Sequence, residues 1–213
     1  APTAPAVSRY LREFLSDPRV VQLPRLFWLP LLRLVVLPLR SRRVAHKYAE
    51  IWMDEGSPLE VHTRRLAEAV RPLLPGVRVE HVMRYGEPAL ARRLRELRAD
   101  GARVLVLPLY PQYSTTTTAS VGDVLARELP GARMVDDYHA DPDWVQAVAA
   151  SIRAHWARHG RGERLLFSFH GIPQRVVDQG DPYERQCHAG ARAIAGALGL
   201  ADDAWQASFQ SRF

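Results

Sequence analysis

The sequence predicts an α/β fold with parallel strands, arranged as two similar halves of which the second is cut short. Apolar runs at residues 104–107 and 165–169 are typical of buried strands in a parallel sheet. Segments with helical spacing separate these runs, and such alternation favours parallel pairing. A strand–helix–strand unit ending in Met-Arg-Tyr-Gly at residues 83–86 resembles a later unit ending in Gln-Ser-Arg-Phe at residues 210–213. This echo indicates an internal repeat.

The first forty residues predict a short helix and an apolar lip. Apolar positions at helical spacing predict an amphipathic helix within residues 1–20, ending before Pro18. Residues 23–40 are strongly apolar, but three prolines and several arginines interrupt them. They predict either a pair of short helices packed on the body or a partly exposed lip around a cleft. The interruptions exclude a transmembrane helix there.

Residues 42–99 predict three helices and one strand. Residues 42–52 have a helical pattern. Ser57-Pro58-Leu59-Glu60 is a capping box with proline at the first helical position, and its helix ends by Pro72. Residues 77–85 alternate apolar and polar side chains, which predicts a strand. Pro88 then begins another helix.

Residues 102–138 predict two strands joined by a helix. Residues 102–110 are the next buried strand, and the threonines at 115–118 precede a helix. The N-terminus of such a helix offers backbone N–H groups to an anion, although simple capping explains the threonines equally well. Residues 133–138 predict a short strand, and Asp141-Pro142 begins a further helix.

The chain is organised around the strand at residues 165–170, with the sequence Leu-Leu-Phe-Ser-Phe-His. Gly171 and Pro173 turn the chain after it, so His170 is expected at the carboxyl end of a strand, where open α/β sheets bind ligands. Asp181-Pro182 begins a helix, and a last strand runs from Trp205 to the end of the chain. The glycines at 160 and 162 predict a linker between halves at residues 1–160 and 161–213.

Composition describes an ordinary globular protein with a basic surface. The chain has 213 residues, 47% apolar and 24% charged, and a net charge of +6, so an acidic partner is expected. Cys187 is the only cysteine, which excludes internal disulfides and an all-cysteine metal cluster within this chain. The pattern shows no clustered base-contacting residues, and nucleic-acid binding is discounted.

Several blocks together resemble the ferrochelatase family, whose members insert ferrous iron into a porphyrin. The blocks are Leu-Pro-Leu-Tyr-Pro-Gln-Tyr-Ser at 107–114, Phe-Ser-Phe-His-Gly-Ile-Pro at 167–173, Gly-Asp-Pro-Tyr at 180–183 and Phe-Gln-Ser-Arg-Phe at 209–213. Shorter matches are Gly-Ser-Pro at 56–58 and Met-Arg-Tyr at 83–85. They follow the family's order over nearly the whole chain.

The resemblance implies a chelatase-like fold, with two Rossmann-like halves of three α/β/α layers facing a porphyrin cleft. It implies that His170 is the catalytic histidine and the residue at the iron site. It also implies substrate-binding roles for six residues, namely Arg40, Tyr48, Ser57, Arg84, Tyr85 and Ser114.

The residue types suit this chemistry. Metallation must remove two pyrrole protons and strip water from the iron, and a neutral imidazole can accept a proton or bind ferrous iron. The propionates of a porphyrin are carboxylates, for which arginine, tyrosine and serine are apt donors. The macrocycle is flat and apolar, as is the lip at residues 23–39.

The resemblance also implies partners and missing parts. The family begins with a strand and a glycine-rich turn before residues like these, and its second half continues beyond Phe213 and supplies a glutamate partner for the histidine. The remainder of the ferrochelatase chain is therefore an expected partner, with protoporphyrin IX and Fe²⁺ as substrates and no required cofactor. A cytoplasmic location is expected, with peripheral contact to the inner membrane through the 23–39 lip.

Three other functions stay open. A close variant of the enzyme acts on coproporphyrin and differs in its propionate contacts. A chelatase that loads cobalt or nickel into sirohydrochlorin would share a similar fold, although the Pro-Gln-Tyr-Ser and Gln-Ser-Arg-Phe blocks argue against it. A non-catalytic tetrapyrrole-binding fragment is the alternative from another functional class.

Overall fold

The computed structural model describes residues 2–210 and divides the chain into two compact units. The first unit comprises residues 1–104 and 120–132, and the second comprises residues 105–119 and 133–213. The border between the compact units therefore does not coincide with the predicted boundary at residue 160. The predicted boundary separates two repeated sets of sequence elements rather than two packed units, and it stays a prediction. Residues 211–213, which carry part of the terminal block, lie outside the described residues.

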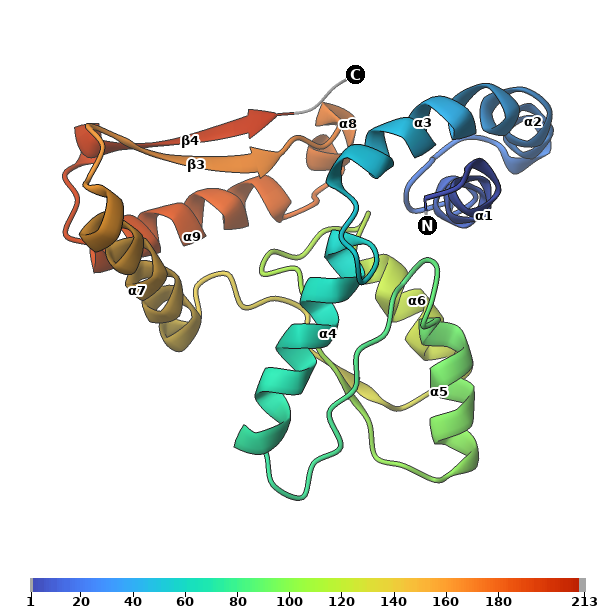
Figure 1. The fold of residues 1–213 in the computed structure, drawn as a ribbon, viewed down its shortest axis with the longest axis horizontal. Coiled ribbons are helices and arrows are strands. Elements are labelled where there is room, and N and C mark those ends of the chain that lie inside the picture. The colour runs from blue at the N-terminus through green and yellow to red at the C-terminus, as the bar shows by residue number, and fades with distance from the viewer. Residues whose placement is uncertain (1, 211–213) are drawn as a thin grey trace. The chain divides into compact units, whose positions relative to one another are not determined.

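The first unit begins with a hairpin of helices (Figure 1). After α1 (Ala4–Leu15), the helices α2 (Arg25–Leu31) and α3 (Leu37–Ile51) are joined by a π-helical turn, η1 (Leu32–Val36). The prediction of two short separate helices is wrong, because residues 25–51 form one continuous helical stretch. Prolines inside a helix remove backbone hydrogen bonds, and the π-helical turn between Pro30 and Pro38 accommodates this locally.

The rest of the first unit contains α4 (Pro58–Val70), η2 (Arg71–Leu73) and α5 (Leu90–Ala99). The serine half of the capping box is confirmed, since the Ser57 hydroxyl accepts a hydrogen bond from the Glu60 backbone. The Glu60 carboxylate pairs with His81 and Arg64 instead. The predicted strand at residues 77–85 is wrong in this structure, where only Met83 forms an isolated bridge, with Ala89. Alternation alone does not make a strand, because a ladder needs a neighbour, and no described strand pairs with this segment.

Two short strands open the second unit. The strands β1 (Leu105–Val106) and β2 (Arg133–Met134) pair in parallel. The strands predicted at 102–110 and 133–138 are therefore too long. Beyond the two paired residues, the Val135 amide donates to the Val106 carbonyl oxygen and the Tyr138 amide donates to the Pro111 carbonyl oxygen. Between them, α6 (Thr118–Glu128) begins in the second unit and continues in the first.

The second unit is dominated by two long parallel strands and two helices (Figure 1). The strand β3 (Leu165–His170) pairs with β4 (Trp205–Gln210) over six residues in parallel register. The helices α7 (Pro142–His159) and α9 (Tyr183–Ala197) pack against one another, and α9 contacts β4. The short helices α8 (Gln174–Asp178) and η3 (Asp202–Ala204) complete the unit. The parallel pairing confirms the predicted α/β class.

Small buried residues let α9 pack closely. Cys187, Ala191 and Ala195 are almost fully buried on it. Gly190 belongs to the same face, and a Cβ there would lie 2.9 Å from the His139 carbonyl oxygen. Glycine is therefore required for the approach of this backbone segment.

Within residues 2–210, no helix is long and apolar enough to cross a membrane.

Candidate active site

His170 is the last residue of β3, as predicted, and its side chain belongs to the exposed face of that strand. Exposure alternates along β3, so Leu166, Ser168 and His170 share one face while the phenylalanines face α9. The Gly171 amide donates to the Gln210 carbonyl oxygen at 2.8 Å, which extends the ladder one residue past His170. The strand end is thus fixed by hydrogen bonds while the imidazole stays accessible.

The loop after β1 is held by a buried carboxylate. Asp181 is 7% exposed and accepts hydrogen bonds from the Ser114 hydroxyl at 3.0 Å and from the Thr115 amide and hydroxyl at 2.7 and 2.6 Å. A carboxylate of this chain therefore already binds the Thr115 amide of the threonine loop, and anion binding at the N-terminus of α6 stays a prediction. Ser114 is only 1% exposed, so its burial does not support direct substrate contact, and that role stays a prediction.

Tyr183 connects this buried carboxylate to His170. Its backbone amide donates to the second oxygen of Asp181 at 3.0 Å, and its hydroxyl contacts the His170 backbone and the Cys187 thiol. Burial raises the pKa of Tyr183, and burial also raises the pKa of Cys187 to about 11. Cys187 is fully buried and stays a thiol at neutral pH, which excludes it as a nucleophile.

In the first unit, Arg84 and Tyr85 are brought together around Asp17. The Asp17 carboxylate oxygen Oδ2 accepts hydrogen bonds from Arg84 at 2.5 Å, from the Tyr85 hydroxyl at 2.7 Å and from the Ser120 hydroxyl at 2.5 Å. Arg84 also donates through Nε to the Ser120 hydroxyl at 2.7 Å. The predicted site residues Arg84 and Tyr85 are therefore members of one hydrogen-bonded cluster.

Burial and hydrogen bonding act in opposite directions on this cluster. Burial raises the pKa of the Asp17 carboxyl, but hydrogen bonds from Ser120, Tyr85 and the Arg19 amide, with the Arg84 charge, outweigh it and leave the pKa below 3.8. Burial also raises the pKa of Tyr85. At neutral pH the cluster therefore contains a carboxylate, a guanidinium and a neutral phenol.

Arg40 and Tyr48 both lie on α3, and Ser57 caps α4. Arg40 is exposed, while Tyr48 is partly buried and meets the rings of Tyr10 and Trp52 edge-on at 6.5 Å each. The Ser57 oxygen accepts the capping bond at 3.2 Å, which leaves its hydroxyl proton able to donate.

An aromatic chain joins these predicted residues. Tyr10 stacks on Phe14 at 6.0 Å, Phe14 meets Tyr85 edge-on at 5.2 Å, and Tyr10 meets Tyr48. Sequence reasoning missed Tyr10 and Phe14 as links, although their spacing of four residues on a helix was a usable signal. It also missed Asp17 and Ser120, which no local pattern connects to Arg84.

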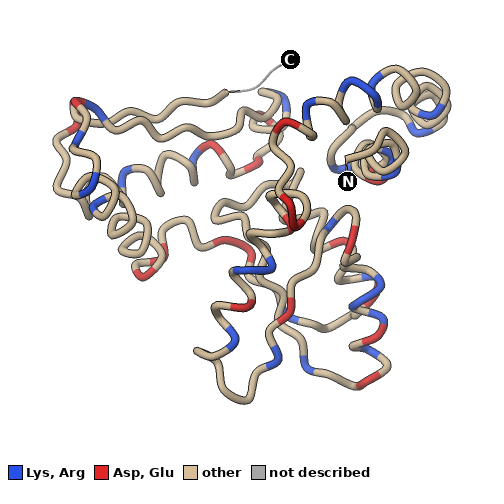
Figure 2. Tube along the Cα trace, in the orientation of Figure 1, with Lys and Arg blue, Asp and Glu red and all other residues tan. Residues whose placement is uncertain are grey.

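The lip exposes a large apolar surface. Leu26 is 81%, Phe27 75%, Leu34 76% and Leu39 72% exposed, which favours the exposed lip over helices packed on the body. Arginines are interleaved with these side chains, as the charge distribution along α2 and α3 shows (Figure 2). The surface therefore combines apolar contacts with positive charge.

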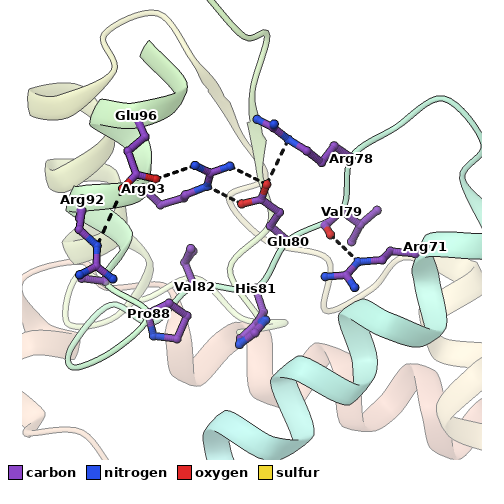
Figure 3. A pocket seen from close by; sticks show the side chains of 11 residues that line it. Arg71, Arg78, Val79, Glu80, His81, Val82, Pro88, Arg92, Arg93 and Glu96 are labelled. Carbon is purple, nitrogen blue, oxygen red and sulfur yellow. Dashed lines mark hydrogen bonds and ion pairs between the residues drawn. The ribbon is translucent and has the colours of Figure 1, made fainter. Parts of the chain in front are cut away.

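A pocket of about 440 Å³ between the 78–82 segment and α5 contains none of the predicted site residues. Figure 3 shows Arg93 between Glu80 and Glu96, with hydrogen bonds of 2.5 and 2.6 Å, and Arg71 bonded to the Val79 carbonyl oxygen. Arg78 also pairs with Glu80. These arginines already bind carboxylates or a carbonyl oxygen of the chain. An anionic ligand would have to displace those partners, so we do not consider this pocket a candidate active site.

The parallel strand pairs and the helices that alternate with them define an α/β protein. A family model described as ferrochelatase matches residues 1–213, and the chain belongs to the ferrochelatase family. Members of this family are lyases that insert ferrous iron into a porphyrin in haem biosynthesis.

Curated relatives agree with this assignment. The chain is 62% identical to a ferrochelatase of Stenotrophomonas maltophilia strain R551-3, with all of this chain and 68% of that protein covered. It is 58% identical to a ferrochelatase of Xanthomonas axonopodis pv. citri strain 306, and the match covers 100% of this chain and 69% of that protein. It is 51% identical to a ferrochelatase of Methylococcus capsulatus strain Bath, and the match covers 100% of this chain and 67% of that protein.

Proposed function

We propose that His170 is the catalytic residue of this ferrochelatase, and that it accepts a pyrrole proton or binds the incoming ferrous ion. The supporting observation is its position as an exposed imidazole at the hydrogen-bonded end of a parallel strand. A porphyrin must release two N–H protons as iron binds its four nitrogens. A neutral imidazole can take one of these protons, or replace a water on the iron before transfer.

The iron is a substrate in this proposal, and no further cofactor is required. The resemblance also implies a glutamate partner for His170, and we assign that role to no residue that the structure describes.

The proposed substrate is protoporphyrin IX, held by donors of the first unit. Arg40 is exposed on α3 and suits a propionate, with Tyr48 on the same helix and the Ser57 hydroxyl as further donors. Arg84 and Tyr85 would contact the macrocycle from the Asp17 cluster. The apolar lip would cover the faces of the ring.

The lip also supports a peripheral membrane contact for an otherwise cytoplasmic enzyme. Its exposed leucines could enter the headgroup region while its arginines meet anionic lipids. Sedimentation of the full polypeptide with vesicles checks this. Binding that persists after Leu26→Ser and Leu34→Ser substitution would contradict it.

The decisive experiment for His170 is turnover per folded molecule in the complete enzyme. His170→Ala should abolish iron insertion and leave porphyrin binding intact, because the donors and the lip are untouched. His155→Ala, at an exposed histidine on α7 of the same unit, is the matched control and should retain activity. A folded His170→Ala enzyme with near wild-type turnover would remove His170 from catalysis.

A further inference from the structure

Asp17 is the most strongly bonded buried acid of the first unit. It is 6% exposed, and its Oδ1 accepts the Arg19 amide at 2.8 Å while Oδ2 accepts three side-chain donors, from Arg84, Tyr85 and Ser120. A buried carboxylate is tolerated only when it is paired and hydrogen-bonded. These four bonds meet that requirement.

The cluster also restricts the two residues that are proposed to meet the porphyrin. Arg84 could otherwise adopt many side-chain conformations, but here Nη2 binds Asp17 and Nε binds Ser120. Tyr85 is fixed through its hydroxyl and by a cation–π contact, with the Arg84 guanidinium 4.4 Å from the ring centre. Removing the carboxylate would take one hydrogen bond from each of the two side chains at once.

Asp17 also lies at a junction between the lip and these residues. It follows α1, whose residue Glu13 accepts the Gly86 amide at 2.8 Å and whose Phe14 ring meets Tyr85. The Leu15 carbonyl oxygen accepts the indole N–H of Trp28, on the first helix of the lip, at 2.7 Å. A segment of five residues thus contacts both the Arg84–Tyr85 turn and the start of the lip.

We propose that Asp17 is a positioning residue for porphyrin binding. Its carboxylate holds the side chains of Arg84 and Tyr85 in place, and its segment fixes their position relative to the lip. This inference rests on the proposed contact of Arg84 and Tyr85 with the porphyrin. Asp17 itself is buried and touches neither porphyrin nor iron. Its effect is therefore on affinity for the porphyrin rather than on the proton-transfer step.

The test is Asp17→Asn in the complete enzyme, with protoporphyrin IX titrated by fluorescence and turnover measured at saturating porphyrin. The substitution keeps the shape but loses the charge-assisted bonds, so KM and Kd for porphyrin should rise about tenfold while kcat changes less than twofold. Asp100→Asn, at an exposed aspartate that follows α5 in the same unit, is the matched control, and its KM should stay unchanged.

If Asp17→Asn does not fold, Ser120→Ala tests the same proposal. It removes one bond to Asp17 and one to Arg84 and should weaken porphyrin binding about three- to tenfold. Unchanged affinity in a folded Ser120→Ala enzyme overturns the proposal, as does unchanged affinity in folded Asp17→Asn.

A double-mutant cycle separates this inference from the proposed function. If Asp17 acts through Arg84, Asp17→Asn should add little to the affinity loss of Arg84→Gln. Fully additive losses overturn the positioning role. If Arg84→Gln alone leaves affinity unchanged, the proposed contact of Arg84 fails and the inference falls with it. If Arg84→Gln weakens binding and Asp17→Asn does not, only the inference is overturned.

Discussion

The Asp181 carboxylate lies 2.7 Å from the Thr115 backbone nitrogen, although 66 residues separate the two positions in the chain. This bond, with those from the hydroxyls of Ser114 and Thr115, joins the loop after β1 to the loop before α9. The β1 loop and the loop that follows the β3 histidine are therefore fixed to each other within the second unit.

Asp181→Asn should destabilise the protein and reduce turnover without removing any proposed substrate donor of the first unit. The variant weakens three bonds to one buried oxygen, which should lower the free energy of unfolding by about 2 kcal/mol. Denaturant unfolding measures this. Asp178→Asn, at an exposed residue whose carboxylate accepts a hydrogen bond from Gln174, should change stability by less than about 0.5 kcal/mol. Equal effects of the two variants would contradict the role given to Asp181.

The Asp17 cluster should make stability dependent on acid pH. Because the folded pKa of Asp17 lies below its ordinary value of 3.8, its stabilisation is complete above that pH and is lost as pH falls through the folded pKa. Thermal unfolding midpoints should be measured for the wild type and for Asp17→Asn at a series of pH values from 6 downward. Below pH 3.8 the midpoint of Asp17→Asn should fall less steeply with pH than that of the wild type. Parallel curves would show that Asp17 has no lowered pKa.

Two glycines of α9 should respond to alanine in opposite directions. At Gly190 the new Cβ would lie 2.9 Å from the His139 carbonyl oxygen, so Gly190→Ala should destabilise by about 1–3 kcal/mol. At Gly196 such a Cβ would have no described heavy atom within 4 Å apart from its chain neighbours and the backbone of its own helix, so Gly196→Ala should stabilise by about 0.5–1 kcal/mol. Melting temperatures of the two variants check the pair. A stabilising Gly190→Ala would refute the packing of α9 described above.

Arg40→Ala should weaken porphyrin binding in the complete enzyme. Loss of one charge-assisted contact to a propionate predicts about a tenfold loss of affinity. Fluorescence titration with protoporphyrin IX, compared with a porphyrin ester that lacks free carboxylates, identifies the group that Arg40 meets. Equal affinity of wild type and Arg40→Ala for protoporphyrin IX would remove Arg40 from the site.

The strand of His170 could be predicted because its information is local. A short apolar run bounded by Arg164 and Gly171, with Pro173 after it, specifies both the strand and its end. The strand predicted from Trp205 is also found. The segment at 77–85 alternates apolar and polar residues but forms no ladder with a described strand, because pairing depends on a neighbour that a local pattern does not contain.

The Asp17 cluster could not be predicted for a related reason. Asp17 and Arg84 are 67 residues apart, and Ser120 is 103 residues from Asp17. A single aspartate before a proline looks like an ordinary helix end. Only tertiary packing shows that its carboxylate faces an arginine and a tyrosine from another segment.

Because side chains alternate between the two faces of β3, the register of β3 against β4 decides on which face His170 lies. Phe169 and His170 occupy opposite faces of the strand, and the phenylalanine contacts the Phe209 ring of β4 at 5.6 Å. A slip of one residue against β4 would turn the imidazole toward α9 and expose the phenylalanine. The aromatic contacts on the more covered face therefore help to determine which side chain the exposed face presents.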